Sequence, residues 1–345
     1  MIQTVDISEF LSLRENTPII DVRSPSEYAQ AHIPGAFNLP LFDDEERRVV
    51  GTLYKKSGRE AAIMEGLDFA GKKLKQFVKQ ARKMAPGRKV LLHCWRGGMR
   101  SESLAWLLNL AGFEVFLLKG GYKAYRRFVI NLWEMPASII ILSGKTGTGK
   151  TEILWEMQKG GQQILDLEKI AHHKGSAFGA IGESPQPTNE QFENDLGDAW
   201  MGLDHNKPIW MEDESHSIGS VYVPQKLYQQ MNLAQVLRLE MPKDLRVKRL
   251  IIDYASYPKE LLIASIKKIE KRLGGLQAKT AILAIEKDDF GTAIDIVLDY
   301  YDKAYTYDLG KRKSEQFLHL ETDTDNAAEN ATKVLEFMHA NEIKK

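Results

Sequence analysis

The chain of 345 residues has a single cysteine, Cys94, and no long apolar run. One cysteine excludes an intramolecular disulfide and a cysteine-based zinc cluster, so this thiol serves either core packing or chemistry. The longest apolar stretches, such as 138-SIIILS-143, are far too short to cross a bilayer. No basic segment followed by an apolar one opens the chain, so no signal peptide is expected. These absences favour a cytoplasmic protein that does not contact a membrane.

The chain has no net charge, because 47 basic residues balance 47 acidic ones, but the charged residues are unevenly distributed along the sequence. Residues 1–135 carry 21 Lys and Arg against 15 Asp and Glu, an excess of +6, which residues 136–345 offset. Residues 155–216 have 4 basic and 12 acidic side chains, whereas residues 238–275 have 10 basic and 5 acidic. A basic patch of this kind either steers a polyanion or is ordinary solvated helix surface.

Apolar patterning predicts two α/β domains, residues 1–135 and 136–345, with the boundary at Pro136. In the first, we expect buried parallel strands at 18–22, 89–93 and 114–118 and helices at 72–84, 101–112 and 121–135. In the second, we expect strands at 138–143, 163–167, 208–212, 234–241 and 317–321, and helices from Lys150 and at 243–253, 259–273, 278–287, 291–305 and 326–340. Segment 174–198 is expected to be a long functional loop.

Cys94 lies in 93-HCWRGGMRS-101, between a predicted strand and a helix that Ser101 is expected to cap. Such a loop directs backbone N–H groups into a small bowl, to which the helix dipole adds positive potential. Arg100 is expected to close the bowl with a planar cation suited to a tetrahedral oxyanion. There Cys94 would be a thiolate nucleophile of lowered pKa; a buried structural cysteine is the other interpretation. The predicted site comprises Cys94, Arg100 and Arg96 as catalytic groups and Trp95, Gly97, Gly98 and Met99 as an anion cradle.

The stretch 21-DVRSPSEYAQAHIPGAFNLP-40 resembles the rhodanese signature, and with the Cys94 loop and 119-KGGYKAY-125 the resemblance covers most of residues 1–130. It implies a rhodanese-like doubly wound sheet whose cysteine carries a persulfide. Cys94 and Arg100 are separated by five residues, one more than in the usual short rhodanese loop. Phosphatases of the related cell-cycle family share this C-x5-R spacing, so a phosphatase with Asp21 as its general acid is an alternative.

The segment 144-GKTGTGKT-151 fits the phosphate-loop pattern G-x-x-x-x-G-K-T and stands between a predicted strand and a predicted helix. Backbone N–H groups of such a loop hold phosphates, Lys150 reaches the terminal ones, and Thr151 is suited to bind Mg²⁺. The predicted phosphate-binding residues are Gly144, Lys145, Thr146, Gly147, Thr148, Gly149, Lys150 and Thr151. No guanine-reading N-K-x-D signature accompanies them, so the loop predicts only a di- or triphosphate ligand. The second domain is thus expected to be P-loop NTPase-like, with a helical C-terminal half.

The run 208-PIWMEDES-215 leads a predicted strand into acidic residues. Glu212, Asp213 and Glu214 are candidates to hold Mg²⁺ through water, with Glu212 and Asp213 preferred, and a capping cluster for the next turn is an equal alternative. Segment 166-DLEKIAHHKGSAFGAIG-182 is either a loop that contacts phosphate or RNA, or a solvated hinge. Its adjacent histidines are poor ligands for one metal. No tightly bound cofactor and no firm metal site is predicted.

The order HCWRGGMRS, GKTGTGKT, D-L-E…H-H-K-G-S-A-F-G and E-D-E-S resembles the tRNA 2-selenouridine synthase family over essentially the full length. The resemblance implies a transferase that acts on 2-thiouridine at the wobble position of tRNA. It implies transfer of a geranyl group from geranyl diphosphate to the sulfur, then replacement of the S-geranyl group by selenium from selenophosphate through Cys94. The phosphate loop would hold geranyl diphosphate, and Cys94 would take up selenium as a perselenide. An apolar cleft for the geranyl chain is expected, but its residues are not predicted.

The expected macromolecular partner is therefore tRNA, bound by the basic face of the first domain together with residues 243–275. The basic candidates in that stretch are Lys243, Arg246, Lys248, Arg249, Lys267, Lys268, Lys271 and Arg272. Three alternative functions are an ATP-dependent rhodanese-type tRNA sulfurtransferase, the C-x5-R phosphatase, and a non-catalytic nucleotide-dependent RNA-binding switch. The last would leave Cys94 without a role.

Overall fold

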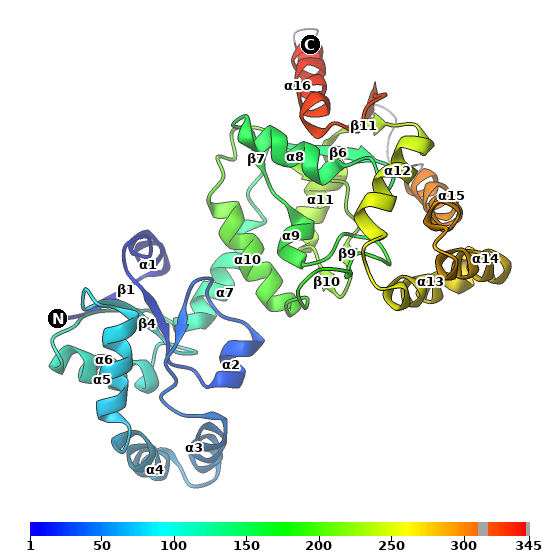
Figure 1. Ribbon diagram of the computed structural model, residues 1–345. Coiled ribbons are helices and arrows are strands. Elements are labelled where there is room, and N and C mark those ends of the chain that lie inside the picture. Colours follow the sequence, from blue (N-terminus) through cyan, green and yellow to red (C-terminus); the bar gives the residue numbers. More distant parts are fainter. Residues whose placement is uncertain (310–316, 343–345) are drawn as a thin grey trace. The chain divides into compact units, whose positions relative to one another are not determined.

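A computed structural model describes residues 1–309 and 317–342, which divide into two compact units (Figure 1). The first unit comprises residues 1–132 together with 193–198. The second comprises residues 133–192 and the described residues from 199 onward. The chain thus passes from one unit to the other between Leu132 and Trp133. Nothing in the sequence predicts that residues 193–198 are counted with the first unit. None of the described helices is long and apolar enough to cross a membrane.

The first unit is built on a parallel sheet of five strands in the order β1-β5-β4-β2-β3. The strands are β1 (Ile2–Val5), β2 (Ile19–Asp21), β3 (Phe37–Asn38), β4 (Lys89–His93) and β5 (Glu114–Leu118). The helices are α1 (Ile7–Leu13), α2 (Pro25–Gln30), α3 (Asp44–Lys56), α4 (Arg59–Gly71), α5 (Leu74–Met84), α6 (Met99–Leu110) and α7 (Gly121–Leu132).

Helices cover both faces of this sheet. On one face, Phe77 of α5 and Leu104 of α6 share an apolar core with the strand residues Val90, Leu92 and Val115. The helices α1 and α7 contact each other and β5. Since strands buried on both faces are near-continuous apolar runs, this explains why β4 and β5 match their predicted bounds. The doubly wound α/β fold predicted for this part of the chain is confirmed.

The second unit has another parallel sheet of five strands, in the order β12-β11-β6-β8-β7. Its strands are β6 (Ile139–Gly144), β7 (Gln163–Ile164), β8 (Ile209–Glu212), β11 (Gln235–Glu240) and β12 (Phe317–Glu321). A small antiparallel pair comprises β9 (Ser217–Ile218) and β10 (Val221–Tyr222). The helices are α8 (Lys150–Lys159), α9 (Leu167–Ala171), α10 (Asn189–Met201), α11 (Gln225–Leu233), α12 (Lys243–Tyr254), α13 (Lys259–Leu273), α14 (Gly275–Glu286), α15 (Phe290–Leu309) and α16 (Ala327–Glu342). Residues 193–198 within α10 are counted with the first unit.

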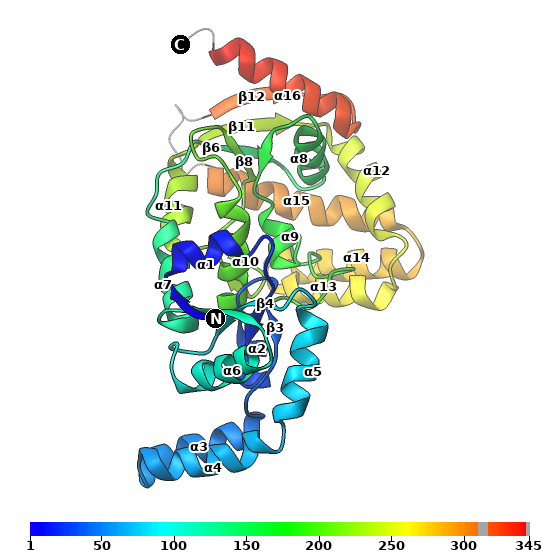
Figure 2. The ribbon, with the colours of Figure 1, turned by 90° about the vertical axis from the view of Figure 1, so that its left-hand side faces the viewer.

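Two apolar cores stabilise the second unit. One lies under the sheet, where Leu154 of α8 and Val334 of α16 pack with Leu142 and Leu239. The other lies among the C-terminal helices α12–α15, with Leu262, Ile266 and Ile285 at its centre. Figures 1 and 2 show these four helices gathered at one end of the unit's sheet. The helical C-terminal half that the sequence predicted therefore has a core of its own.

Segment 174–198, predicted to be a long loop, ends in a helix. Residues 189–198 are the first part of α10, which Thr188 caps by accepting a hydrogen bond from the Gln191 N–H at 3.1 Å. The prediction is wrong for residues 189–198 because it rested on the presence of Gly, Pro and Asn in the segment. The helical signal is the spacing of Phe192, Leu196 and Trp200, which are all fully buried.

Candidate functional site

Cys94 lies at the carboxyl edge of the first sheet, between β4 and α6, and its side chain is buried. Its Sγ accepts hydrogen bonds from the Gly98 N–H at 3.4 Å and the Ser101 hydroxyl at 3.2 Å. The prediction that Ser101 caps α6 is wrong, because α6 begins at Met99 with Gly98 as its N-cap. Ser101 lies in the first turn instead, and its hydroxyl faces the thiol.

Gly97 is required by the close winding of the loop that follows Cys94. Its φ is +66°, in the region that disfavours side chains, and a Cβ there would lie 2.7 Å from the Leu118 carbonyl oxygen. The Cys94 carbonyl in turn accepts a hydrogen bond from the Tyr122 N–H at 2.8 Å. The segment from β5 into α7 therefore holds the back of the cysteine loop.

Opposing effects set the pKa of Cys94. Burial raises it, whereas hydrogen bonds from the Ser101 hydroxyl and from the backbone N–H groups of Gly98 and Arg96 lower it. The positive charge of Arg100 lowers it further, and the balance leaves the pKa of Cys94 below its ordinary value. The loop thus stabilises the thiolate, the form that acts as a nucleophile.

The two arginines near Cys94 are placed differently. Arg100 donates hydrogen bonds to the two carboxylate oxygens of Glu27 at 2.6 and 3.3 Å, so its guanidinium is not free to close the bowl as expected. Arg96 is exposed. Glu27, which the sequence does not single out, thus fixes the cation that acts electrostatically on the thiol.

The other members of the predicted anion cradle are more exposed than Cys94. The Trp95 side chain is exposed, and its ring centre lies 5.6 Å from that of Tyr122. Met99 is exposed as well, and its sulfur lies 3.8 Å from a guanidinium nitrogen of Arg59. The groups that converge on the sulfur are thus backbone N–H groups and one hydroxyl.

Asp21 is not available as a general acid. Its buried carboxylate accepts hydrogen bonds from the Arg23 guanidinium at 2.6 and 3.0 Å. Burial raises the pKa of Asp21, but the charge of His93 and the hydrogen bonds and charge of Arg23 lower it below its usual range. An ionised, paired carboxylate donates no proton, so the role considered for Asp21 is wrong.

We expect the substitution Ser101→Ala to raise the pKa of Cys94, because it removes a donor that stabilises the thiolate. Less thiolate would then be present at neutral pH, and the midpoint of the alkylation profile would move to higher pH. Iodoacetamide labelling against pH measures this, and the single cysteine makes the readout specific. Ser103→Ala, an exposed change on the same helix, is the control. Identical profiles for the Ser101 variant and the unmodified chain would contradict the assignment.

The phosphate loop has the strand–loop–helix form that its sequence predicts, with residues 144–151 joining β6 to α8. The N–H and the hydroxyl of Thr148 both donate to the Lys145 carbonyl, at 3.2 and 2.6 Å. Gly149 has a φ of +72°, and a Cβ there would lie 2.9 Å from the Arg249 guanidinium carbon. The Lys150 ammonium folds back over the loop and donates to the Gly144 carbonyl at 3.0 Å. This carbonyl contact is one that a bound phosphate can replace.

Arg246 supports the phosphate loop from α12. It donates to the Thr146 carbonyl at 3.1 Å and forms a two-point ion pair with Asp302 at 2.7 and 2.9 Å. Its side chain is 2% exposed, so the prediction that it contacts RNA phosphates is wrong. Lys145 also lies near the Asp302 carboxylate, at 3.6 Å.

Three glutamates gather beside Lys150. Glu168, Glu212 and Glu214 bring one carboxylate oxygen each within 4.8 Å of one another. Burial and the neighbouring carboxylates raise the pKa of each to about 8, against the opposing charge of Lys150. Among the residues that the structure describes, the buried Oε1 of Glu212 has no hydrogen-bond partner. The group therefore has the oxygen ligands that suit a divalent cation, whose charge would favour the ionised form of the three carboxyls.

Asp213, paired with Glu212 in the sequence prediction, lies outside this group. Its carboxylate accepts a hydrogen bond from the Ser143 hydroxyl at 2.5 Å. Glu214, also a candidate from the sequence, belongs to the group, as does Glu168, which the sequence did not single out and which sheet topology could have identified. Since β6, β7 and β8 are parallel and adjacent, their carboxyl ends meet at one edge of the sheet.

The two adjacent histidines do not converge, as expected for a pair that cannot share one metal. His172 forms a hydrogen bond through Nδ1 with the Pro185 carbonyl at 3.0 Å. The ring of His173 packs against Gly179, where an added Cβ would lie 2.9 Å away. Lys174 pairs with Glu183 at 3.4 Å.

Comparisons with known proteins match both parts of the chain. A family model described as the tRNA 2-selenouridine synthase AAA domain matches residues 137–335, and a rhodanese-like domain model matches residues 6–128. A tRNA 2-selenouridine synthase of Shewanella denitrificans is 36% identical, with 90% of this chain and 94% of the relative covered. The proteins of the same name from Shewanella piezotolerans and Marinobacter nauticus are 37% and 34% identical, over 92% and 90% of this chain and 95% and 93% of the relatives.

Proposed function

Because the chain belongs to the tRNA 2-selenouridine synthase family, we propose that it replaces the sulfur of a 2-thiouridine in tRNA by selenium. A geranyl group passes from geranyl diphosphate to the sulfur at the phosphate loop. The S-geranyl group is then exchanged for selenium from selenophosphate at Cys94. The observation that carries this proposal is that one chain holds both an activated thiol and a phosphate loop.

Geranyl transfer needs the carbon–oxygen bond of the allylic diphosphate to break while the thiouridine sulfur bonds to carbon. Negative charge then grows on the departing diphosphate. Lys150 and the N–H groups of residues 144–151 offset this charge. In the structure the Lys150 ammonium binds the Gly144 carbonyl, a contact that a bound diphosphate would replace.

The carboxylate group of Glu168, Glu212 and Glu214 fits Mg²⁺, which would neutralise further charge on the diphosphate when bound. Thr151 would be its neighbour, since the Thr151 hydroxyl lies 3.4 Å from a Glu168 oxygen. Burial is the main cause of their raised pKa values of about 8, and the mutual repulsion of the carboxylates adds to it against the single ammonium of Lys150.

We expect Glu212→Gln to raise the Mg²⁺ concentration needed for half-maximal geranylation by roughly 10- to 100-fold, the usual loss when a residue that supports a metal is replaced. The substitution keeps the size of the side chain and removes its charge. Magnesium titrations of geranyl transfer measure the effect. Asp213→Asn, which alters the neighbouring carboxylate outside the group, is the matched control. A Glu212 variant with the unmodified magnesium curve would exclude this cation site.

Selenium transfer is redox-neutral when the Cys94 thiolate attacks phosphorus. The sulfur–phosphorus bond forms, the phosphorus–selenium bond breaks, and its electron pair leaves on selenium. The selenide adds to C2 of the alkylated uridine, geranylthiolate departs, and water later releases phosphate from Cys94. The perselenide expected from the resemblance would require removal of two electrons, so we replace it by this route.

The surroundings of Cys94 support attack on phosphorus. The loop after Cys94 directs backbone N–H groups toward the sulfur, an arrangement that suits a tetrahedral phosphoryl group. A phosphatase would need a general acid to protonate an alkoxide, and Asp21 cannot serve because it is ionised and buried against Arg23. Selenide is a far weaker base than an alkoxide, so it leaves without a proton donor.

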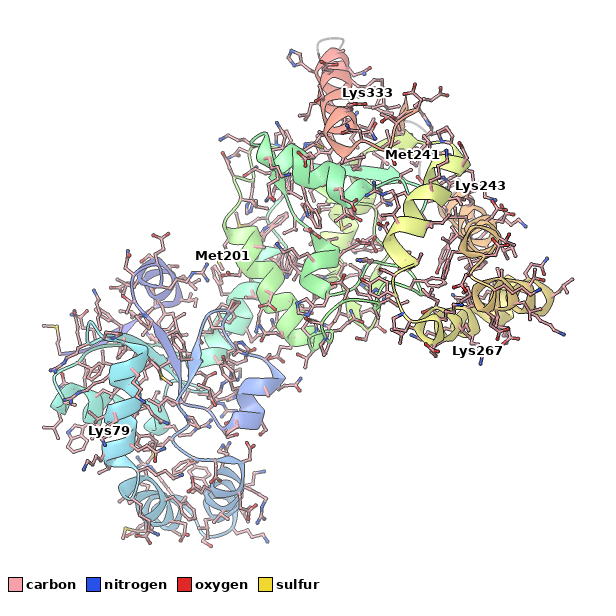
Figure 3. All side chains as sticks on the ribbon, viewed as in Figure 1. Lys79, Met201, Met241, Lys243, Lys267 and Lys333 are labelled. Carbon is pink, nitrogen blue, oxygen red and sulfur yellow. The ribbon has the colours of Figure 1, made fainter. Side chains whose placement is uncertain are left out.

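The exposed basic face of α13 is our candidate tRNA contact. Lys267, Lys268, Lys271 and Arg272 are exposed and share one helical stripe, and Figure 3 labels Lys267 on it. Lys243 on α12, labelled in the same figure, instead pairs with Asp295 and Asp299, at 2.6 Å each. Within the predicted basic stretch, Lys243 is thus engaged in ion pairs, whereas the basic residues of α13 are exposed and can contact RNA.

We expect reversing Lys267, Lys268 and Lys271 to glutamate to weaken tRNA binding and to flatten its salt dependence. Each lost phosphate contact should lower the slope of log affinity against log salt by roughly one. Filter binding at several salt concentrations measures both quantities. Lys279→Glu, an exposed change on α14, should leave them near those of the unmodified chain. An unaltered slope in the triple variant would place the RNA contact elsewhere.

The proposed function is tested by mass spectrometry of nucleosides from tRNA containing 2-thiouridine. Incubation with geranyl diphosphate should yield the S-geranyl nucleoside, and later addition of selenophosphate should yield 2-selenouridine. Product that forms only when ATP is supplied would favour the ATP-dependent sulfurtransferase instead.

A further inference from the structure

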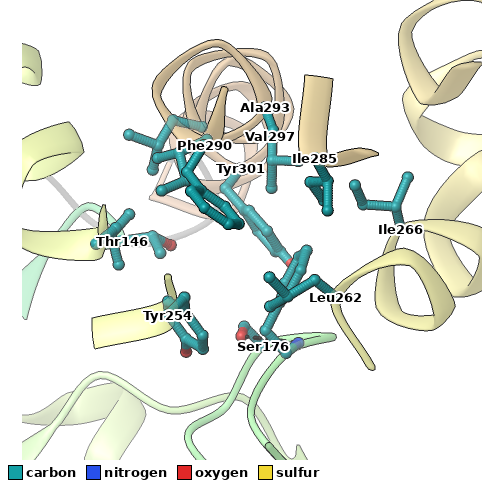
Figure 4. A pocket seen from close by; sticks show the side chains of 14 residues that line it. Thr146, Ser176, Tyr254, Leu262, Ile266, Ile285, Phe290, Ala293, Val297 and Tyr301 are labelled. Carbon is teal, nitrogen blue, oxygen red and sulfur yellow. Dashed lines mark hydrogen bonds between the residues drawn. The ribbon is translucent and has the colours of Figure 1, made fainter. Parts of the chain in front are cut away.

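The helices α12–α15, together with Thr146, Ser176 and Phe178, line an apolar cavity that is partly open (Figure 4). Its walls include Leu262 and Ile266 of α13, Ile285 of α14, and Phe290, Ala293 and Val297 of α15. Most of these side chains also belong to the core of the helical part. Protein cores are normally packed without voids larger than a water molecule, and an apolar void does not hold water well. A hydrocarbon is therefore the suitable guest.

This cavity adjoins the phosphate site. Thr146 of the phosphate loop, Ser176, Leu250, Tyr254 and Tyr301 line both the cavity and the polar depression that contains Lys150 and the three glutamates. In Figure 4, Thr146 lies on one side of the cavity, and Ile266 and Ile285 lie on the opposite side. A ligand held by the phosphate loop could thus extend from Thr146 toward the far wall.

The chemistry of the walls disfavours a nucleobase. The polar side-chain groups of the lining are the hydroxyls of Thr146, Ser176, Tyr254 and Tyr301. The Tyr301 hydroxyl already accepts a hydrogen bond from the Ala177 N–H at 2.9 Å. A base buried here would leave several donors and acceptors unpaired, which is costly, whereas a hydrocarbon chain needs no partners.

We propose that this cavity binds the hydrocarbon chain of an allylic diphosphate whose diphosphate group occupies the phosphate loop. The inference rests on the proposed geranyl transfer and adds its substrate pocket. The chain passes Tyr254 and Tyr301 and ends against Ile266 and Ile285, so these two isoleucines limit its length. The phosphate loop thus selects for the diphosphate group of the donor, and the far wall of the cavity selects for the length of its hydrocarbon chain.

Calorimetry with the full chain tests the pocket directly. Because each buried methylene strengthens binding about fourfold, burial of only about three or four carbons of the chain should make geranyl diphosphate bind roughly 100-fold more tightly than inorganic diphosphate. Ala293→Phe fills the cavity and should weaken geranyl diphosphate binding by roughly 10-fold or more. It should leave inorganic diphosphate binding unchanged, and the shorter dimethylallyl diphosphate should be affected less. Leu276→Phe, an exposed change on α14, should behave like the unmodified chain.

If Ala293→Phe fails to fold, a variant that enlarges the pocket tests the same proposal through chain-length preference. Ile285→Ala removes part of the far wall and should shift preference from geranyl toward the longer farnesyl diphosphate by roughly 10-fold, from the added methylenes that it can bury. Unchanged chain-length preference in the folded variants overturns the pocket assignment, as does equal binding of geranyl and inorganic diphosphate by the unmodified chain.

The same measurements separate the pocket from the proposed function. Chain-dependent binding that Ala293→Phe abolishes, without geranyl transfer to tRNA, would support the pocket and overturn the proposed transfer. Normal transfer by Ala293→Phe, with unaltered chain preference, would overturn the pocket alone.

Discussion

Cys94→Ser should lower the formation of 2-selenouridine by roughly 1,000-fold or more, the scale of loss when a nucleophile is removed. A serine hydroxyl remains protonated at neutral pH, so the hydrogen bonds that stabilise the Cys94 thiolate have no anion to act on. Geranylation by the same variant should stay within about twofold of normal, because alkyl transfer uses no protein thiol. Nucleoside mass spectrometry on one set of samples measures both products.

Two further observations sharpen the Cys94 experiment. Ser101→Ala keeps the thiol and loses one hydrogen bond, so selenation should fall only about fivefold. Incubation of the unmodified chain with selenophosphate alone should leave a phosphoryl group on Cys94, whereas a selenium adduct would favour the perselenide. Normal selenation by Cys94→Ser would overturn the catalytic assignment, and loss of both activities would point to a damaged fold.

The fold could be predicted where apolar runs are continuous. Strands β4 and β5 are buried along most of their length, and their predicted and observed bounds agree. The antiparallel helices α3 and α4, shown side by side in Figure 2, were not predicted. No residue of α3 is buried, and the buried residues of α4 are the small Ala62 and Gly66, so neither helix has the fully buried large apolar residues that mark an element from sequence. The periodicity of apolar residues in a sequence predicts a helix through its buried face, and α3 and α4 bury few side chains.

The site shows the same limit at the level of side chains. Motif spacing identified Cys94 and Lys150, whose surroundings depend on local backbone. It did not identify Glu27 and Glu168, because each acts together with residues distant in sequence. Glu27 pairs with Arg100, and Glu168 lies beside Glu212 and Glu214 at the end of β8. Arg246 shows the converse, since a charge counted as surface is buried against Asp302. Partners that tertiary structure brings together have no signature in one sequence.

Lys150→Ala should lower geranyl transfer by roughly 100-fold or more, because several kcal/mol of charge stabilisation on the departing diphosphate is lost. The variant should still convert tRNA supplied already S-geranylated, since that step uses Cys94. Geranylation and selenation rates are measured separately by nucleoside mass spectrometry. Lys159→Ala is the matched control, because that lysine lies at the exposed end of the same helix and pairs with Glu156.

Because Lys150 is buried, its replacement can lower geranyl transfer by destabilising the fold as well as by removing charge from the diphosphate site. Removing its ammonium leaves Glu168, Glu212 and Glu214 without their cation, which raises their pKa values further and favours protonation or Mg²⁺ binding. A thermal unfolding curve must therefore accompany the rates, and selenation of pre-alkylated tRNA reports whether the chain is intact. Since the loop recognises phosphates and no base, ATP should compete with geranyl diphosphate without being consumed. Normal geranylation by Lys150→Ala, or a need for ATP hydrolysis in the unmodified chain, would replace this interpretation by a nucleotide-driven one.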